Sequence, residues 1–357
     1  MTSTHNDIRH WLTTLFVHRR HRRGSRRGTK SHKSSKIGYV GHERRRSILS
    51  KKNTCGGCRK NSEICHKCPI DHWPDERKVK CLPKPYEFLS YESDILSSVF
   101  SGLVVFFSIV TVVILGLFLL YWDTPIVRAN NRSVSVTLLV SILLSFLSVF
   151  FFLGHPVDIT CQLRQTLFSV FFTIAVSSVL SKTITVCIAF KATKPRSPWR
   201  KLMGHKLAIS IVLVFSMIQA VICVMWLAIA PPYQEYDFTS YNEKIIIQCN
   251  EGSVLAFYLM LGYMGLLASV SFVLAFMVRT LPDSFNEAKY ITFSMLLFCS
   301  VWIAMIPAYL STRGKYMVAV EIFAILTSCA GILVCIFFPK CYIMLLKPEI
   351  SIRNIKK

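Results

Sequence analysis

Seven long apolar runs dominate this chain of 357 residues and constrain its fold more than any other feature. A helix needs about 20 apolar residues, each rising 1.5 Å, to cross a hydrocarbon core of about 30 Å. A water-soluble protein would need amphipathic helices to cover seven such segments, and the sequence has none. It therefore predicts an all-α membrane protein, a seven-transmembrane helix bundle, with spans near residues 97–122, 133–153, 165–190, 207–230, 253–278, 290–310 and 316–338.

The net charge of +23 is concentrated at one end of the chain. Residues 1–53 hold 15 Lys and Arg against Asp7 and Glu43. A nucleic-acid-binding domain spreads its basic residues over a folded face, so no nucleic-acid partner is expected. Residues 1–53 lack an apolar stretch long enough for a signal peptide, and their composition predicts a disordered tail. This tail is either a functional basic arm or, as we favour, the incidental start of a truncated chain.

The orientation of the spans follows from the basic residues in the short loops. Four segments on one side hold 15 Lys and Arg, and the four on the other side hold 8. The richer side should be cytoplasmic, so we expect residues 55–92 to be extracellular and the C-terminus to be cytoplasmic. The membrane that we expect for this multi-pass protein is the plasma membrane. The richer segments are 123–132, 191–206, 279–289 and 339–357; the poorer are 77–96, 154–164, 231–252 and 311–315.

A group of cysteines precedes the first span. The two C-x-x-C pairs lie closer together than in common zinc modules, and a thioredoxin-like redox site would need a surrounding βαβ unit. Thiols outside the cell oxidise to disulfides, so a disulfide-rich module is the favoured interpretation over zinc or redox chemistry. Their odd number leaves at least one without a partner in the segment. The five are Cys55, Cys58, Cys65, Cys68 and Cys81.

Several motifs carry a resemblance to a known family. They are Cys65-His-Lys-Cys68-Pro69 before the first span, Asp-Thr-Pro-Ile-Val-Arg-Ala-Asn-Asn-Arg at 123–132, Leu-Pro-Asp-Ser-Phe-Asn-Glu-Ala-Lys-Tyr at 281–290, and Phe-Pro-Lys-Cys-Tyr at 338–342, where the seventh helix is expected to end. Over residues 65–350 the chain resembles class C G protein-coupled receptors, most closely the vomeronasal type-2 (pheromone) receptors, with calcium-sensing receptors as near relatives. The family's ligand-binding clamshell domain and most of its cysteine-rich domain have no counterpart here.

The resemblance suggests four regions. They are a basic tail (1–53), a remnant of the cysteine-rich extracellular domain (54–92), a seven-transmembrane domain (93–342) and a short cytoplasmic tail (343–357).

The resemblance implies a receptor that transduces an extracellular chemosensory signal to a heterotrimeric G protein. Membrane lipid and a second class C receptor, in a homodimer or heterodimer, are the other implied partners. The alternatives are a calcium- or amino-acid-sensing class C receptor and a truncated product that does not signal. No enzyme is expected, because catalytic and nucleotide-binding motifs do not occur, and no cofactor or metal ion is predicted. A transporter or channel is disfavoured, because such a protein would have internal repeats or several intramembrane charges, and this sequence has no repeat and one clear intramembrane charge.

Lys182 is the most informative single residue, because it lies inside the third span. An unpaired Lys at the centre of a span costs about 2.5–3.5 kcal/mol. Its long side chain could extend to the interface, or it could pair with Glu287, which lies just before the sixth span. In the family, matching Lys and Glu residues form a contact between helices three and six that holds the inactive state. We therefore expect a Lys182–Glu287 pair.

Further site residues follow from position and resemblance together. Cys161 and Cys249 should lie at one level of the membrane on the outer side, where the family also has a disulfide. We expect a second disulfide between Cys68 and Cys81.

Trp302 resembles the family's tryptophan in the upper transmembrane cavity, and Glu321 lies about one turn below the outer surface. The alternatives are a lipid-facing Trp302 and a Glu321 that extends to the interface. Pro307 in the sixth span is expected to be a hinge point. The candidate G protein contacts are Arg128, Arg200, Lys201, Asn286 and Glu287.

Overall fold

The computed structural model describes residues 68–75, 80–91, 94–122, 131–191, 205–238, 241, 243–279 and 287–346. The described residues form two units: a stalk unit, made of residues up to Glu87 with Asp237–Ile246, and a helical unit, made of Phe88–Tyr236 with the residues from Ile247 onward. In chain order the elements are β1 (His72–Pro74), β2 (Cys81–Pro83), β3 (Tyr86–Glu87), α3 (Ile95–Leu120), α5 (Arg132–Ser148), η1 (Val149–Phe151), α6 (Asp158–Lys191), α8 (His205–Ile229), β4 (Tyr233–Asp237), β5 (Ile245–Asn250), α9 (Val254–Val278), α10 (Glu287–Ser311) and α11 (Lys315–Leu346).

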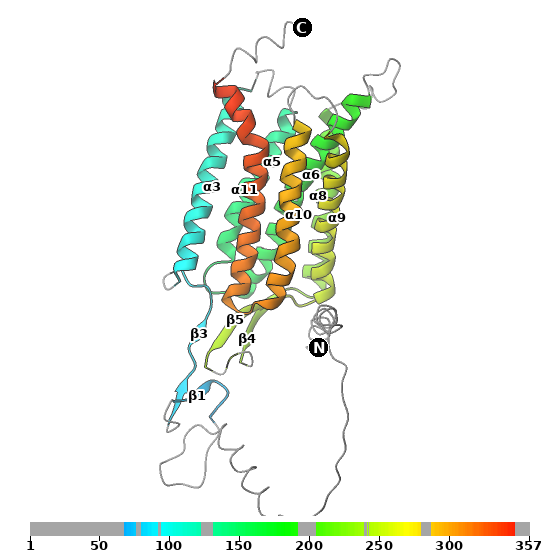
Figure 1. Cartoon of the computed structure of the whole chain (residues 1–357). Coiled ribbons are helices and arrows are strands. Elements are labelled where there is room, and N and C mark those ends of the chain that lie inside the picture. The colour runs from blue at the N-terminus through cyan, green and yellow to red at the C-terminus, as the bar shows by residue number, and fades with distance from the viewer. Residues whose placement is uncertain are drawn as a thin grey trace, which may run out of the picture. The chain divides into compact units, whose positions relative to one another are not determined.

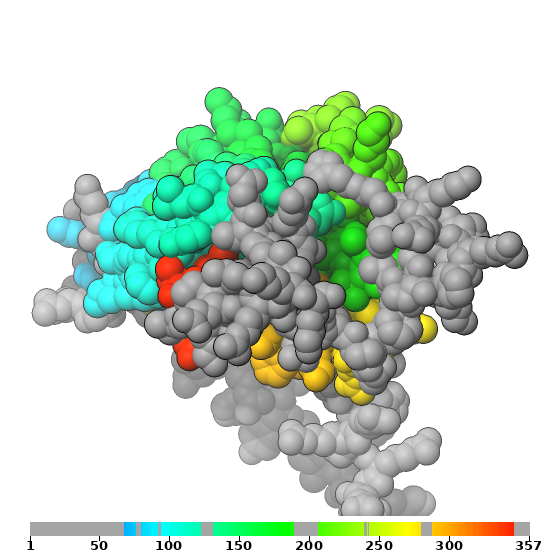
Figure 2. All heavy atoms as spheres, turned by 90° about the horizontal axis from the view of Figure 1, so that it is seen from above, coloured from blue at the N-terminus to red at the C-terminus, as the bar shows by residue number. Residues whose placement is uncertain are grey.

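The helical unit contains the seven predicted membrane spans. Seven helices of the described chain are long and apolar enough to cross a bilayer, which confirms the predicted fold class. Figure 1 shows them side by side, and Figure 2, seen from the end at which α11 finishes, shows the colours passing around the bundle from cyan through green and yellow to red. We call that end the tail end, and the end that holds Cys161 and Gly252 the hairpin end.

Helix α6 is the central helix of the bundle. It packs against α5, α8, α9 and α10. The most apolar part of α6 is 67% buried, against 22% for α3 and α8, whose outward faces are apolar. Small hydroxyl side chains are spaced along α6, and such residues let helix backbones approach closely inside a membrane. The fully or almost fully buried ones are Ser169, Thr173, Ser177, Ser178, Ser181 and Thr183.

Two helices are longer than the sequence analysis predicted. Helix α6 begins at Asp158 rather than near residue 165, and an acidic residue in the first turn favours a helix N-terminus. Helix α11 continues through Pro339 to Leu346, so the prediction that it ends at residues 338–342 is wrong. A proline removes one helix hydrogen bond, and buried residues on both sides, including Phe337 and Met344, continue to pack in the core beyond it.

Helices α10 and α11 are closely packed. A Cβ atom added to Gly331 would clash with Cδ2 of Leu297, so only a glycine fits unless that leucine moves. Pro307 lies inside α10, four residues before its last residue Ser311, and therefore nearer the hairpin end than mid-span.

The structure adds short strands that the sequence analysis did not predict. In the stalk unit β1 and β2 pair antiparallel, with Trp73 opposite Leu82. Strand β3 pairs in parallel with the beginning of β5, Tyr86 opposite Ile245. Strand β4 lies at the other edge of this three-stranded sheet, next to β5. Because only residues 238–244 connect β4 to β5, too few for a parallel crossover, these two strands form a hairpin.

Candidate functional site

Four aromatic side chains of α6 and α10 pack together in the interior of the helical unit. On each helix the two residues are four apart, which places them on one face. The ring of Phe172 lies 5.1 Å from that of Phe298 and 5.8 Å from that of Trp302. The ring of Phe168 lies 6.1 Å from that of Trp302. Trp302 therefore faces the bundle, but its Nε1 has no hydrogen-bond partner among the described residues.

Buried charged groups of α6 and α11 lie at the hairpin end of the bundle. Glu321 is 7% exposed, and its Oε1 accepts a 3.4 Å hydrogen bond from Gln165 Nε2. Arg164 is 6% exposed, and its guanidinium carbon lies 5.5 Å from the ring of Phe152. Glu321 Oε2 and Arg164 Nε find no hydrogen-bond partner in the described part of the chain. Unpartnered buried polar atoms are rare, and they indicate where water or a polar ligand group binds.

A small cavity lies beside Arg164. Its volume is about 20 Å³, which is enough for one water molecule. Residues before α3, from the α5–α6 connection, from β5 and from the start of α11 line it. They are Phe88, Leu89, Phe151, Phe152, Gly154, Pro156, Arg164, Ile247, Gln248, Gly314, Lys315 and Val318.

The segment before α3 is held against the α5–α6 connection. The carbonyl oxygen of Leu89 accepts a 2.9 Å hydrogen bond from the backbone N–H of Gly154. The hydroxyl of Tyr91 donates a 3.0 Å hydrogen bond to the carbonyl oxygen of Phe150. Gly154 has φ +88°, and a Cβ there would meet the Tyr91 ring at 2.7 Å. The chain entering α3 is therefore fixed to the bundle.

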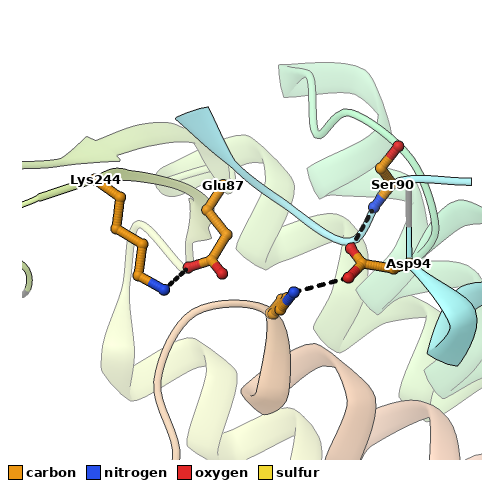
Figure 3. A network of polar contacts seen from close by, with 5 residues as sticks. Glu87, Ser90, Asp94 and Lys244 are labelled. Atoms are coloured by element: carbon orange, nitrogen blue, oxygen red, sulfur yellow. Dashed lines mark hydrogen bonds and ion pairs between the residues drawn. The ribbon is translucent and has the colours of Figure 1, made fainter. Parts of the chain in front are cut away.

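A second attachment joins this segment to α11. Asp94 Oδ2 accepts a 3.3 Å hydrogen bond from the backbone N–H of Ser90, as Figure 3 shows. Asp94 Oδ1 lies 2.7 Å from Nζ of Lys315, the first residue of α11. The hydrogen bond from Lys315, which stabilises the charged form, lowers the pKa of Asp94 below its ordinary value.

The β4–β5 hairpin is fixed to the first turns of α6. A disulfide joins Cys161 to Cys249 on β5, with their Cα atoms 5.5 Å apart. Asp158 Oδ1 accepts a 2.8 Å hydrogen bond from the backbone N–H of Gln234 on β4. Both strands of the hairpin are thus tied to one helix.

The turn between β5 and α9 closes over the end of α8. Gly252 has φ +65°, and its N–H donates to Asn250 Oδ1 at 2.9 Å. The indole N–H of Trp226 on α8 donates a 3.1 Å hydrogen bond to the carbonyl oxygen of Glu251. The hydroxyl of Tyr309 on α10 donates to Glu251 Oε1 at 3.2 Å. This turn therefore links α8, α9 and α10.

The stalk unit has its own disulfide and ion pair. Cys68 and Cys81 are joined, with Cα atoms 5.8 Å apart. Lys244 Nζ lies 2.7 Å from Glu87 Oε2, an ion pair that Figure 3 also shows. The pair joins β3 to the residue preceding β5, next to the parallel pairing of these strands.

Lys182 lies within α6 and is 3% exposed. Its Nζ donates a 2.8 Å hydrogen bond to Ser135 Oγ in the first turn of α5. Glu287 is the first residue of α10, but its side chain lies outside the described residues, so the Lys182–Glu287 pair stays a prediction. The structure thus adds a contact to α5 that the sequence analysis did not predict.

Other predicted positions also lie outside the described residues. Of the candidate G protein contacts these are Arg128, Arg200, Lys201 and Asn286, and of the cysteines before the first span they are Cys55, Cys58 and Cys65. Residues 1–53 lie outside as well.

The sequence analysis did not single out Arg164, Gln165, Asp94 and Lys315. Each lies in or next to the end of an apolar run, where water can satisfy a polar side chain without a protein partner. Their position near the end of a span could have marked them as candidate site residues. Which of them meet, however, depends on how α3, α6 and α11 pack.

Comparison with known sequences gives one family and several curated relatives. Residues 90–340 match the family model described as "7 transmembrane sweet-taste receptor of 3 GCPR". Vomeronasal type-2 receptor 26 of Mus musculus is 53% identical over 283 residues, which are 79% of this chain and 33% of that receptor. Vomeronasal type-2 receptor 116 of Mus musculus is 46% identical over 289 residues, 81% of this chain and 34% of the receptor.

The extracellular calcium-sensing receptor of Homo sapiens is also similar. It is 45% identical over 304 residues, which are 80% of this chain and 28% of that receptor. The chain thus spans about a third of the length of these relatives.

Proposed function

Because this chain belongs to the class C G protein-coupled receptors, we propose that it acts as a receptor of the vomeronasal type-2 kind. In this proposal it lies in the plasma membrane and transmits an extracellular chemosensory signal to a heterotrimeric G protein. The hairpin end faces outward and the tail end faces the cytoplasm, as the distribution of Lys and Arg among the loops indicates. Like other class C receptors, it works as a dimer.

One observation carries the proposal: both strands of the hairpin are fixed to the helix that also bears Lys182. Cys161 and Asp158 hold β5 and β4 at the hairpin end of α6. Lys182 follows Cys161 by 21 residues on the same unbroken helix, a rise of about 32 Å. A displacement of the hairpin therefore moves α6, and with it the buried Lys182 that bonds to α5.

The segment before α3 provides a second route. Its ion pair holds it to Lys315, the first residue of α11, and its hydrogen bonds to Phe150 and Gly154 hold it to the connection between α5 and α6. A signal arriving through the chain before Phe88 would then act on α3, α6 and α11 together. Since these helices pack around one core, their relative shift would alter the tail end, where a G protein binds.

The aromatic and charged groups of the interior fit a modulatory site. Glu321 supplies a buried carboxylate, one oxygen of which has no hydrogen-bond partner among the described residues, and the aromatic cluster that includes Trp302 supplies stacking surface. These groups match an arylalkyl ammonium ion, whose cation would meet the carboxylate and whose ring would stack. Glu321→Gln keeps an acceptor for Gln165 but removes the charge, so it should abolish the effect of such a probe on signalling.

A chimera tests the receptor function. The extracellular part of the human calcium-sensing receptor is joined before Cys68, and calcium-stimulated nucleotide exchange on a heterotrimeric G protein is measured per receptor at the cell surface. We expect stimulation by calcium, and we expect none in a matched chimera that carries Cys161→Ser and Cys249→Ser. A chimera that reaches the surface with both disulfides formed, yet gives no calcium-dependent exchange with any G protein class, would contradict the proposal.

A further inference from the structure

The β4–β5 hairpin displays three tyrosines close together in the chain. Tyr233 and Tyr236 on β4 are each 45% exposed, and Tyr241 in the connection is 39% exposed. A tyrosine normally buries most of its ring in a folded protein, so exposed hydroxyl-bearing rings are accessible to a modifying enzyme. The three differ in their immediate surroundings.

Only Tyr236 has an acidic residue on both sides. Glu235 precedes it and Asp237 follows it. Tyr233 follows two prolines and precedes Gln234, and Tyr241 has the ammonium group of Lys244 4.7 Å from its ring centroid. The strand that carries Tyr236 is extended and lies at the edge of its sheet.

The carboxylate of Glu235 and the hydroxyl of Tyr236 are both held in place. Glu235 Oε2 accepts a 2.9 Å hydrogen bond from Asn250 Nδ2 on β5. Gln234 Nε2 donates a 3.1 Å hydrogen bond to the Tyr236 hydroxyl oxygen. That bond uses a lone pair of the hydroxyl oxygen, and Tyr236 as a residue is 45% exposed, so a transferase can approach its side chain.

We propose that Tyr236 is a tyrosine sulfonation site, modified as the chain passes through the secretory pathway. The inference rests on the proposed function in one respect, namely that the hairpin faces the lumen and then the outside. The donor is an adenosine phosphosulfate, a polyanion that a transferase must bind with basic groups. Such a basic cleft attracts an acceptor tyrosine flanked by carboxylates, and it disfavours one covered by a lysine.

The transfer balances without a redox step. The phenolic oxygen of Tyr236 forms a bond to the sulfur of the donor, and the bond from that sulfur to the phosphate oxygen of the donor breaks. The phenolic proton goes to a base of the transferase, and adenosine bisphosphate leaves. The product has one permanent negative charge between Glu235 and Asp237, which makes the hairpin edge a stronger docking surface for cationic groups.

The test uses the full chain, tagged at its C-terminus and expressed in cells fed with radiolabelled sulfate. The purified protein is analysed with an antibody against sulfotyrosine and by accurate peptide mass. We expect the hairpin peptide to carry a sulfonate on Tyr236, and we expect Tyr236→Phe to lose the antibody signal. Tyr233→Phe and Tyr241→Phe are the matched controls and should keep it. Replacing both flanking acids, Glu235→Gln with Asp237→Asn, should also cause a loss of the signal.

A separate variant shows on which side of the membrane the β4–β5 hairpin lies. Lys244→Thr completes an Asn-x-Thr glycan acceptor that begins at Asn242, and a glycan is added there only if the hairpin is lumenal. If the acceptor is glycosylated but the wild-type peptide carries no sulfonate, the inference is wrong and the orientation stands. If the acceptor receives no glycan, both the proposed orientation and the inference are wrong. An added group that a phosphatase removes from Tyr236 would also overturn the inference.

Discussion

Lys315 Nζ lies 2.7 Å from Asp94 Oδ1, so the first residue of α11 is paired with the residue that directly precedes α3. The two residues are 221 positions apart in the chain. Their side chains are 21% and 18% exposed, so solvent screens the pair only in part. The pair closes the bundle between its first and last helices.

The stability of the protein should change with pH in a way that reflects the ion pair between Asp94 and Lys315. Because the pKa of Asp94 is lowered below its ordinary value of 3.8, the pair stabilises the fold fully above that value and loses its effect as the pH falls through the lowered pKa. Asp94→Asn should cost about 1 kcal/mol or less at neutral pH. The difference in melting temperature between the wild type and Asp94→Asn should shrink below pH 3.8.

Thermal unfolding of the protein in detergent, measured across this pH range, checks the prediction. Asp94→Lys combined with Lys315→Asp should recover part of the stability that either single change removes. If the double variant is no more stable than the singles, the two side chains do not interact.

The disulfide between Cys161 and Cys249 should contribute substantially to stability. It closes a loop of 88 residues, and a disulfide of this kind typically contributes about 2–4 kcal/mol. Cys161→Ser, Cys249→Ser and the double variant should therefore lower the melting temperature equally. Cys335→Ser is the control, since Cys335 lies in α11 and forms no disulfide with another described cysteine.

Peptide mapping without reduction gives a direct measurement. It should recover Cys161 linked to Cys249, and Cys68 linked to Cys81. Recovery of these residues as alkylated free thiols would exclude the corresponding bond, and zinc bound in equal amount to the protein would exclude the pairing in the stalk unit.

Gly252 should not tolerate a side chain. Its φ is +65°, and an added Cβ would lie 2.6 Å from the carbonyl oxygen of Ala230 and 2.7 Å from that of Pro231. These are backbone atoms, so the clash cannot be relieved by a rotamer change. Gly252→Ala should cost about 1–3 kcal/mol, seen as a lower melting temperature and less receptor at the cell surface.

Gly262 is the matched control for this substitution. It lies in α9, and a Cβ there would meet no atom of the described residues within 4 Å. Since Ala favours a helix more than Gly does, Gly262→Ala should be neutral or slightly stabilising. If Gly252→Ala and Gly262→Ala change the melting temperature equally, the turn at Gly252 does not have the conformation described above.

Basal signalling should depend on Lys182. If Lys182 pairs with Glu287 as well as bonding to Ser135, it holds α6 to α5 and α10 in the resting state. Lys182→Ala or Glu287→Ala should raise nucleotide exchange without ligand, because a hundredfold shift between two states takes only about 2.7 kcal/mol. Ser135→Ala removes a single neutral acceptor and should have a smaller effect.

Exchange is measured per receptor at the surface, and the variant with both charges reversed should return partly to low basal activity. Unchanged basal exchange in both single variants, at normal expression in the chimera with the calcium-sensing receptor, would exclude the pair as a lock.

The sequence by itself determined the spans and the class of the protein. Seven charge-poor runs are sufficient for this, because a helix in lipid satisfies its own backbone hydrogen bonds and needs only an apolar surface. The helix ends were harder to predict. The polar first turns of α6 lower its hydropathy, yet Arg164 and Gln165 are buried by protein rather than exposed to water or lipid.

Only the tertiary structure decided which polar residues meet. Asp94, which precedes α3, meets Lys315 of α11. Gln165 of α6 meets Glu321 of α11, and Lys182 of α6 meets Ser135 of α5. Nothing in the local sequence specifies such pairs, because they depend on the packing and the register of helices that are distant in the chain. The apolar pattern shows which residues enter the membrane, whereas the burial of a charge beside its partner is a property of the assembled bundle.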